Sequence, residues 1–343
     1  MGLVVMPFYF KKENIMTNHT QATPTLVPKM YPMDVFGFTG TNVQVQGFEP
    51  CGHPNVPLEC EYVFSRENVR DVIGFLDCSF GDGLMISGPT GCGKTSVIEQ
   101  ILARLHRPAQ SYTCGASTEF MDLVGQWVMV AGDMVWMDGC LTTAMRHGHV
   151  LILNEIDLVD PAQLANLNAV LEGAPLVITH NGGEIVKPHA DFRFIATCNG
   201  NGNGGDGIYV GVQRQNLAFM DRFNVIKTNY LNPDIELDIL KKVTPKIPNT
   251  IAKRMIELAN KVRSIFIGEG DDDNIELSVT FSTRTLIRWA VLTQRNKGAG
   301  CPLSYALDRA LLNRCAEKEE VEAIRALAIG LFGDSFNPAE NEN

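Results

Sequence analysis

The middle of the chain alternates short, wholly apolar runs with longer stretches in which apolar residues recur at helical spacing. A run of four apolar residues, such as 150–153, is typical of a strand that is buried on both faces of a sheet. Strands separated by helical stretches indicate a parallel sheet with helices on both faces, and therefore an α/β fold. The predicted strands are 84–87, 150–153, 192–196 and 223–226, and the predicted helices are 65–76 and 95–106.

Two β-hairpins interrupt this alternation. The first is predicted over 127–136, with its turn at Ala131-Gly132-Asp133. The second is predicted over 176–186, with its turn at Asn181-Gly182, because both residues tolerate the positive φ that a two-residue hairpin turn requires.

The composition of the chain changes along its length, and 343 residues allow about two domains. Gly, Pro and turn residues are frequent over 31–62, whereas helical stretches dominate after residue 232. Both ends of the chain are predicted to be disordered. The predicted segments are a disordered arm over 1–30, a small irregular module over 31–62, an α/β domain over 63–231, a helical domain over 232–332 and a disordered tail over 333–343.

The charge and the cysteine content of the chain limit the kinds of partner and the cellular compartment that are expected. The formal net charge is -10, and no stretch is rich in Lys or Arg, which disfavours a nucleic-acid partner and an anionic membrane. No apolar run approaches the roughly 20 residues that cross a bilayer, and the apolar stretch 2–10 lacks the features of a signal peptide. Nine cysteines without a Cys-x-x-Cys pair predict reduced thiols in a cytoplasmic protein.

The octapeptide from Gly88 to Thr95 fits the pattern G-x-x-x-x-G-K-[ST], between a predicted strand and a predicted helix. Its glycines let successive backbone N–H groups face a phosphate, and the helix N-terminus adds partial positive charge. We expect Lys94 to reach the terminal phosphates of ATP and the Thr95 hydroxyl to ligate Mg²⁺. The predicted nucleotide-binding residues are Gly88, Pro89, Thr90, Gly91, Cys92, Gly93, Lys94 and Thr95.

A polar pair, Asn154-Glu155, follows the apolar run 150–153. In P-loop ATPases the first residue of this pair is usually Asp, which holds the Mg²⁺ shell, and the second polarises the attacking water. Asn154 keeps an oxygen for a metal-bound water but lacks the carboxylate charge, so weaker Mg²⁺ binding or slower turnover is expected. Glu155 is the predicted general base. Asp157 either compensates for the missing charge or has a capping or packing role.

Asn199 follows the strand that is predicted over 192–196. The carboxyl ends of parallel strands face the ligand crevice of such a sheet. Asn199 is therefore predicted to orient the attacking water beside the γ-phosphate.

Two arginines complete the predicted catalytic set. Arg222 precedes the last predicted strand, from where it would reach the site of a neighbouring subunit and make hydrolysis depend on a ring. The alternative for Arg222 is a surface ion pair with Asp221. Arg284 begins a helix of the second domain and would contact the γ-phosphate of its own subunit; the alternative is a solvated arginine at a helix start.

Two groups of possible metal ligands are weaker candidates. Cys51, His53 and Cys60 lack a fourth ligand at a usual spacing. His147 and His149 lie in the turn before a predicted strand. Turn and helix-end roles are favoured for both groups.

These elements, in this order, resemble the AAA+ superfamily, and the two hairpins place the chain with its MoxR branch. The segments Asp122-Leu123-Val124-Gly125, Gly211-Val212-Gln213 and Ser282-Thr283-Arg284-Thr285 are similar to those of the AAA+ subunits of aerobic cobaltochelatases. The resemblance covers most of the chain. It implies a five-stranded parallel sheet of order 5-1-4-3-2, a helical lid domain, ATP and Mg²⁺ as cofactors, and a hexameric ring.

The same resemblance implies that the ring drives a partner protein with a von Willebrand-type metal-binding domain, as in the insertion of Co²⁺ into a corrin. Three alternatives stay open. Related ATPases activate other metalloenzymes, such as Rubisco or nitric oxide reductase. A nucleic-acid motor would line a pore with the hairpin at Asn181-Gly182, which offers only Lys187, beside Glu184. A scaffold that binds ATP and hardly hydrolyses it would fit Asn154.

Overall fold

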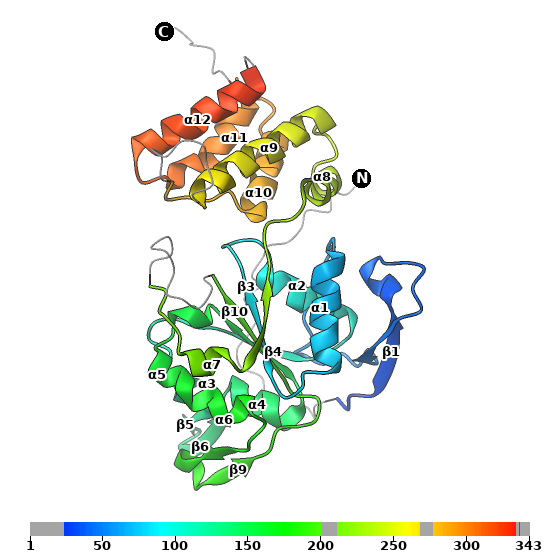
Figure 1. Ribbon diagram of the computed structural model, residues 1–343, viewed down its shortest axis with the longest axis vertical. Helices are drawn as coiled ribbons and strands as arrows, with labels where there is room; N and C mark the ends of the chain where they lie inside the picture. The colour runs from blue at the N-terminus through cyan, green and yellow to red at the C-terminus, as the bar shows by residue number, and fades with distance from the viewer. Residues whose placement is uncertain (1–23, 200–210, 268–276, 334–335, 337–343) are drawn as a thin grey trace.

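The computed structural model describes residues 24–199, 211–267, 277–333 and 336. An α/β unit lies between a bundle of helices at one end and two β-hairpins at the other (Figure 1). Every helix within these ranges is too short or too polar to span a membrane.

Five parallel strands form the central sheet, in the spatial order β11-β3-β10-β7-β4. In chain order this is 5-1-4-3-2, so the predicted sheet is confirmed. The strand β4 was not among the predicted ranges, because it lies at the sheet edge beside β7 and its sequence, AQSYT, has no apolar run. The strands are β3 Gly83–Ser87, β4 Ala109–Thr113, β7 Val150–Asn154, β10 Arg193–Cys198 and β11 Phe223–Lys227.

Successive side chains of the buried strands fill cores on opposite faces of the sheet, as the strand period of two requires. Leu84 and Ile152 pack on one face with α1 Arg66–Asp77 and α2 Lys94–Arg104. Met85 and Leu151 pack on the other face with several short helices. These are α3 Phe120–Val124, α4 Cys140–His147, η2 Ile156–Leu158, α5 Pro161–Leu164, η3 Ala165–Leu167, α6 Asn168–Leu171 and α7 Leu217–Met220.

The segment before α1 forms an antiparallel ribbon against the α/β unit. Phe36 and Val45 of this ribbon are buried in the same core as α1 and α2. The ribbon begins within the predicted arm over 1–30 and continues into the predicted irregular module; residues 1–23 lie outside the described ranges. Its elements are β1 Pro28–Pro32, η1 Met33–Phe36 and β2 Gln44–Phe48.

The helices of the C-terminal bundle pack around Phe281 and Trp289, which are fully buried. Phe336 lies within the predicted disordered tail, but it is also buried in this core, beside Phe332, because it is a large apolar side chain close to the end of the last helix. The helices are α8 Pro233–Val243, α9 Asn249–Phe266, α10 Thr283–Arg295, α11 Pro302–Ala310, η5 Leu312–Arg314 and α12 Lys318–Phe332.

Both predicted hairpins are present. In the first, β5 Gly125–Val130 pairs with β6 Asp133–Asp138 and places Trp127 opposite Trp136. In the second, β8 Leu176–Ile178 pairs with β9 Glu184–Val186. The two-residue turn predicted at Asn181-Gly182 is wrong, because the positive φ angles fall on Gly182 and Gly183, and Asn181 ends the short helix η4 Thr179–Asn181.

Candidate nucleotide-binding and hydrolysis site

The loop from Gly88 to Gly93 connects the end of β3 to the start of α2, at the carboxyl edge of the sheet. Gly91 has φ +73°, and a Cβ atom there would lie 2.3 Å from the Cβ atom of Ser282. A Cβ atom at Gly88 would lie 2.3 Å from the carbonyl oxygen of Thr228. Both positions therefore require glycine, and the loop is fixed between β11 and the helical bundle.

Lys94 is buried and directs its ammonium group into this loop. Its Nζ atom donates to the carbonyl oxygens of Gly88 and Pro89, at 2.7 and 3.0 Å, and to Oδ1 of Asn199 at 2.9 Å. Burial lowers the pKa of Lys94, while the nearby carboxylates of Asp157 and Glu155 act against that shift. Among the described residues Lys94 forms no ion pair, and a phosphate in the loop would offer it a charged partner.

Cys92 lies inside the loop, and burial raises the pKa of its thiol. A redox-sensitive cysteine needs a thiolate that is exposed and favoured by its surroundings. Its burial and this pKa shift therefore disfavour a redox role for the Cys92 thiol.

Thr95 and Asn154 meet at the predicted metal position. The Thr95 hydroxyl donates to Oδ1 of Asn154 at 2.6 Å, and the Asn154 amide donates to the Ser111 hydroxyl at 3.1 Å. The Thr197 hydroxyl also donates to Oδ1 of Asn154, at 3.3 Å. These uncharged oxygens fit Mg²⁺, which keeps several waters and usually takes few direct protein ligands beside phosphates. Sequence reasoning did not identify Ser111, which lies on the unpredicted strand β4.

Glu155 follows Asn154 at the end of β7 and has an exposed side chain. Its φ is +56°, a conformation that is uncommon for a residue other than glycine. Its backbone N–H donates to the hydroxyl of Thr197 at 3.3 Å. This turn leaves the Glu155 carboxylate at the same sheet edge as Lys94, in a position open to water.

Asp157 is buried and holds Asn199 in place. The Asp157 Oδ2 atom accepts a hydrogen bond from the backbone N–H of Asn199 at 2.9 Å. Because Asn199 in turn accepts from Lys94, one chain of contacts links Asp157 to the phosphate loop. Of the two sequence-based alternatives for Asp157, the packing role agrees with this burial, and its particular function is to position Asn199.

Arg222 lies at the amino end of β11, whose first residue pairs with the first residue of β3. The loop at the carboxyl end of β3 is therefore about 16 Å away, the length of a five-residue strand. The Arg222 Nε atom donates to Glu172 Oε1 at 2.9 Å, and Nη1 donates to the carbonyl of Ala218. The alternative of an ion pair with Asp221 is thus wrong in its partner, which is Glu172, the residue after α6.

Arg284 lies in the first turn of α10 and is exposed. Within the described residues it has no hydrogen-bond or ion-pair partner. Ser282, two residues earlier, packs against Gly91 of the phosphate loop. The helix start that carries Arg284 therefore lies beside the loop, with the guanidinium available for a ligand.

Three of the possible metal ligands, His53, His147 and His149, form a histidine cluster. The rings of His53 and His149 lie 5.0 Å apart at right angles, and the ring of His147 is 5.7 Å from that of His149. Burial, followed by the charges of His53, His147 and His189, lowers the pKa of His149 to about 4. Across the described ranges, no three His, Cys, Asp or Glu side chains have a geometry that could hold a metal ion. The contact between His53 and His149 joins the N-terminal segment to the turn before β7.

Comparison with known proteins agrees with this geometry. The model for an AAA domain (dynein-related subfamily) matches residues 83–223, and the model for a CbbQ/NirQ/NorQ C-terminal domain matches residues 236–329. The chain is 32% identical over 298 residues to the aerobic cobaltochelatase subunit CobS of a Sinorhizobium species, which covers 83% of this chain and 85% of CobS.

Two further relatives are more distant. Identity is 26% over 251 residues with protein NorQ of Paracoccus denitrificans, covering 73% of this chain and 86% of NorQ. It is 26% over 250 residues with protein CbbQ of Hydrogenophilus thermoluteolus, covering 73% of this chain and 87% of CbbQ. The phosphate loop, the sheet order and these similarities together show that the chain belongs to the MoxR family of AAA+ ATPases.

Proposed function

We propose that this protein is an ATP-hydrolysing motor that forms a ring, with six subunits as the expected number, and remodels a partner protein. The observation that carries the proposal is the convergence of Lys94, Thr95, Asn154 and Asn199 through direct hydrogen bonds at the edge of the sheet. Four groups that are up to 105 positions apart in the chain meet where parallel strands present their ligands.

The contacts of each residue suggest its part in hydrolysis. Lys94 exchanges the carbonyl oxygens of Gly88 and Pro89 for the terminal phosphates of ATP. Thr95 and Asn154 would hold Mg²⁺ and its waters, and this ion supplies positive charge to the phosphates. Asn199 orients the attacking water, and Glu155 accepts its proton as the water oxygen bonds to the γ-phosphorus. The bond from that phosphorus to the oxygen that bridges the β- and γ-phosphates breaks, and ADP and inorganic phosphate are released. Arg284 contacts the γ-phosphate from the lid.

The neutral Asn154 predicts a measurable weakness in Mg²⁺ binding. We expect Asn154→Asp to tighten Mg²⁺ binding at least about tenfold, because a unit negative charge about 5 Å from a divalent cation attracts it by on the order of 7 kcal/mol at an effective dielectric constant of 20. The cost of removing water from both charges offsets part of this attraction. The Ser111 hydroxyl, which now accepts from the amide, can rotate and donate to the new carboxylate. The measurement is the Mg²⁺ dependence of ATP hydrolysis.

The control for this substitution is Asn166→Asp, at an exposed position on η3. It changes the net charge equally and should leave the Mg²⁺ dependence unchanged. An unaltered Mg²⁺ dependence in Asn154→Asp would mean that another side chain holds the metal shell.

The two hairpins support a protein partner. Eight large apolar side chains on them, here called the hairpin surface, are from 43% to 74% exposed. Single exposed apolar residues are common, but a group of this size on one part of a molecule indicates a binding surface. Its methionines are adaptable contacts for a partner of irregular shape. The hairpin surface consists of Trp127, Met129, Val130, Met134, Val135, Met137, Val177 and Ile185.

Two contacts join the hairpins into one unit. Trp127 Nε1 donates to the carbonyl of His180 at 2.8 Å. Arg146 bridges Asp138 on β6 and Glu184 on β9, at 2.9 Å to each carboxylate. Because the hairpin surface itself is apolar, the hairpins suit a protein better than the phosphates of a nucleic acid.

The partner that we propose carries a von Willebrand-type metal-binding domain, and the similarity to a cobaltochelatase subunit favours metal insertion as the work of the complex. A related metalloenzyme activated in the same way is the second candidate. Both depend on the hairpin surface.

The hairpin surface gives the test of the partner. We expect the double substitution Met129→Ser and Met137→Ser to lower capture of the partner at least about tenfold, since each buried methionine contributes about 1.5–3 kcal/mol. ATP hydrolysis without the partner should be unchanged. The measurement is copurification with the tagged ATPase, followed by identification of the bound protein. Leu58→Ser, at a side chain that is 90% exposed and remote from the hairpins in sequence, is the control. Undiminished capture by the double variant would place the partner elsewhere.

A further inference from the structure

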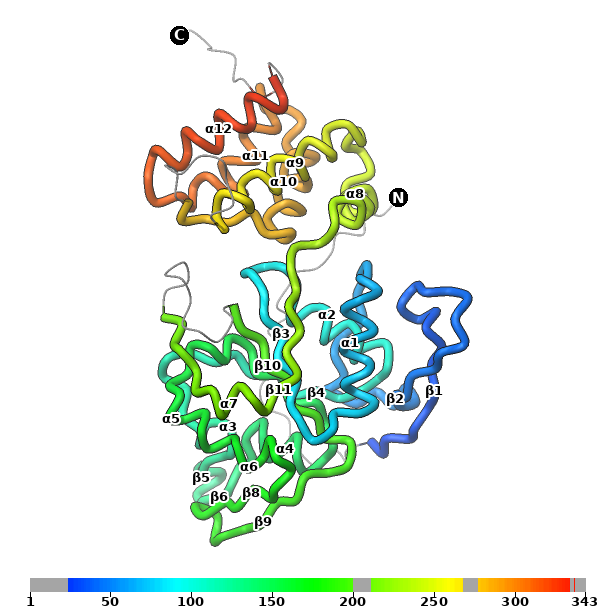
Figure 2. The backbone as a smooth tube through the Cα atoms, in the orientation of Figure 1, coloured from blue at the N-terminus to red at the C-terminus, as the bar shows by residue number. Residues whose placement is uncertain are grey.

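The connection that leaves β11 and enters α8 runs from the α/β unit to the helical bundle (Figure 2). Tyr230 lies in this connection and contacts both the phosphate loop and the segment that leads into α10. Its hydroxyl donates to the carbonyl oxygen of Thr90, at 3.2 Å, and is 2.8 Å from the hydroxyl of Thr280. Since a tyrosine has one hydroxyl proton, and this proton is directed to Thr90, Thr280 supplies the proton of the second hydrogen bond. One side chain thus joins residues that are 190 positions apart.

The ring of Tyr230 is held in place by a buried ion pair. The guanidinium of Arg263 lies over the ring, 4.3 Å from its centre. Both Arg263 and Glu236 are buried, and they form two parallel hydrogen bonds of 2.9 and 2.8 Å. Such a bidentate pair permits little movement of either side chain. The ring of Tyr230 therefore rests on a rigid part of the bundle.

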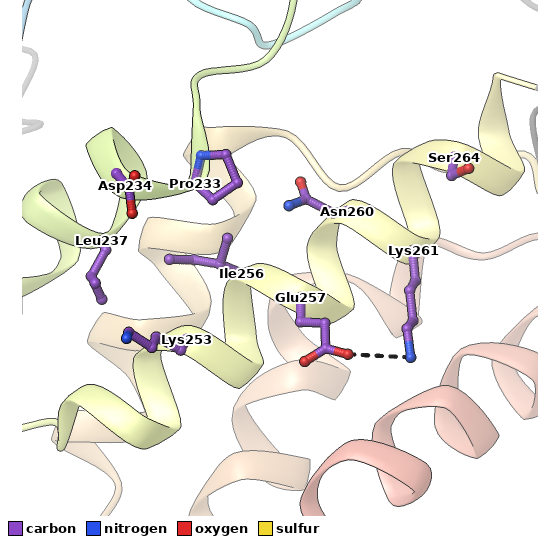
Figure 3. A pocket seen from close by; sticks show the side chains of 9 residues that line it. All are labelled: Pro233, Asp234, Leu237, Lys253, Ile256, Glu257, Asn260, Lys261 and Ser264. Atoms are coloured by element: carbon purple, nitrogen blue, oxygen red, sulfur yellow. Dashed lines mark ion pairs between the residues drawn. The ribbon is translucent and has the colours of Figure 1, made fainter.

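The same ion pair fixes the start of α10. Arg263 Nε donates to the carbonyl of Phe281 at 2.7 Å, and the Thr283 hydroxyl donates to Glu236 at 2.7 Å. Tyr230, the ion pair and the segment that leads into Arg284 form one continuous network. A groove between α8 and α9 lies next to this network, and Asn260 is one of the residues that line it (Figure 3). Asn260 also accepts from Arg263 at 2.8 Å.

The geometry of the hydrogen bond between Tyr230 and the Thr90 carbonyl depends on whether the phosphate loop holds a phosphate. The Thr90 carbonyl and the Gly91 N–H belong to one planar trans peptide group, so they point in opposite directions. When a phosphate accepts the Gly91 N–H, as the proposed function requires, the Thr90 carbonyl is held outward, toward Tyr230. An empty loop leaves this peptide group freer to turn.

We infer that Tyr230 is a positioning residue that transmits the nucleotide state of the phosphate loop to the first turn of α10, and so to Arg284. The inference rests on the proposed function, because it requires nucleotide in the loop. A bound phosphate strengthens the Thr90–Tyr230 hydrogen bond, and the Arg263–Glu236 pair carries the constraint to residues 281–285.

The test is hydrogen exchange of backbone amides, with and without a slowly hydrolysed ATP analogue and Mg²⁺. In the parent protein, nucleotide should slow exchange at the phosphate loop. It should also slow exchange at Thr285 and Leu286, whose amides donate to the side chain and carbonyl of Ser282. In Tyr230→Phe we expect the loop to respond as in the parent and the α10 response to fall at least about fivefold, a usual size for coupling between sites.

Two further variants sharpen the result. Thr280→Val removes the other hydrogen bond of the Tyr230 hydroxyl and should weaken the α10 response in the same direction. Tyr305→Phe is the matched control, because Tyr305 also lies under an arginine, Arg309, on α11 of the bundle. It should behave as the parent does.

The outcomes separate the two claims. If nucleotide slows exchange at the phosphate loop and at the start of α10 equally in Tyr230→Phe and in the parent, the role of Tyr230 is overturned. The proposed function would then remain intact. No protection of the loop in the parent would instead contradict the proposed function. Exchange without nucleotide should be equal in the parent and in Tyr230→Phe, because the phenyl ring still packs under Arg263; a general increase in Tyr230→Phe would mark a structural role only and would also overturn the inference.

Discussion

Replacing Glu155 with Gln should lower the rate of ATP hydrolysis by about a hundredfold or more while ATP binding is unchanged, because a general base contributes about 10²–10⁴ to the rate. The amide has the shape of the carboxylate but cannot accept the proton of the attacking water. Glu155 has an exposed side chain at the end of β7, and its backbone is held by Thr197 in both proteins. Steady-state hydrolysis and binding of a fluorescent ATP analogue measure the two effects separately.

The matched control is Glu257→Gln, which removes the same charge from an exposed position on α9. It should hydrolyse ATP at the parental rate. Equal rates for Glu155→Gln and its parent would exclude Glu155 as the base. They would also favour the scaffold alternative if both rates were close to zero.

Replacing Arg222 with Ala should reduce hydrolysis on the order of a thousandfold, the contribution of an arginine supplied to a neighbouring site. Arg222 lies at the amino ends of the strands, whereas its own phosphate loop lies at their carboxyl ends. Glu172 orients the guanidinium of Arg222. Arg222 is therefore too far from the phosphate loop of its own subunit to contact a nucleotide bound there. This position fits action across a subunit interface of a closed ring.

Mixed rings test this directly. Arg222→Ala and Glu155→Gln proteins, each inactive alone, should recover activity when they are mixed and allowed to assemble. About a quarter of the interfaces in a random equal mixture combine an intact Glu155 with an intact Arg222 of the next subunit. Absence of recovery, with mixed assembly verified by mass, would contradict a role in trans. Arg254→Ala, at an exposed position on α9, is the control for the loss of one arginine.

The sheet was predictable where its strands are buried on both faces. The runs that became β3 and β7 are continuous and apolar, and burial on both faces leaves few other residue choices. The edge strand β4 was missed because half-exposed positions accept polar residues, and a five-residue sequence such as AQSYT carries no period. The prediction of the turn at Asn181-Gly182 was wrong because Gly182 and Gly183 together can also adopt positive φ angles. Local sequence does not show which of the two pairs forms the turn.

The site was predictable as far as its motifs extend along the chain. The phosphate loop and the Asn154-Glu155 pair are local patterns with a fixed strand and helix context. The partners that hold them come from distant segments. Ser111 approaches Asn154 from β4, and Glu172 reaches Arg222 from the end of α6. The role of Asp157 depends on its contact with Asn199, the residue that follows β10. Contacts of this kind join residues that are far apart in the chain. They depend on strand order and packing, which short sequence patterns do not reveal.

The central claim is that the loop from Gly88 to Thr95 binds the phosphates of ATP, and Lys94→Ala tests it most directly. The ammonium group forms charge-assisted hydrogen bonds, each worth about 1.5–3 kcal/mol, so the dissociation constant for ATP with Mg²⁺ should rise at least about tenfold. Isothermal titration calorimetry of the parent, of Lys94→Ala and of Lys253→Ala, an exposed lysine on α9, gives the comparison. We expect Lys253→Ala to bind ATP as the parent does. Equal affinity of Lys94→Ala and the parent would contradict the account.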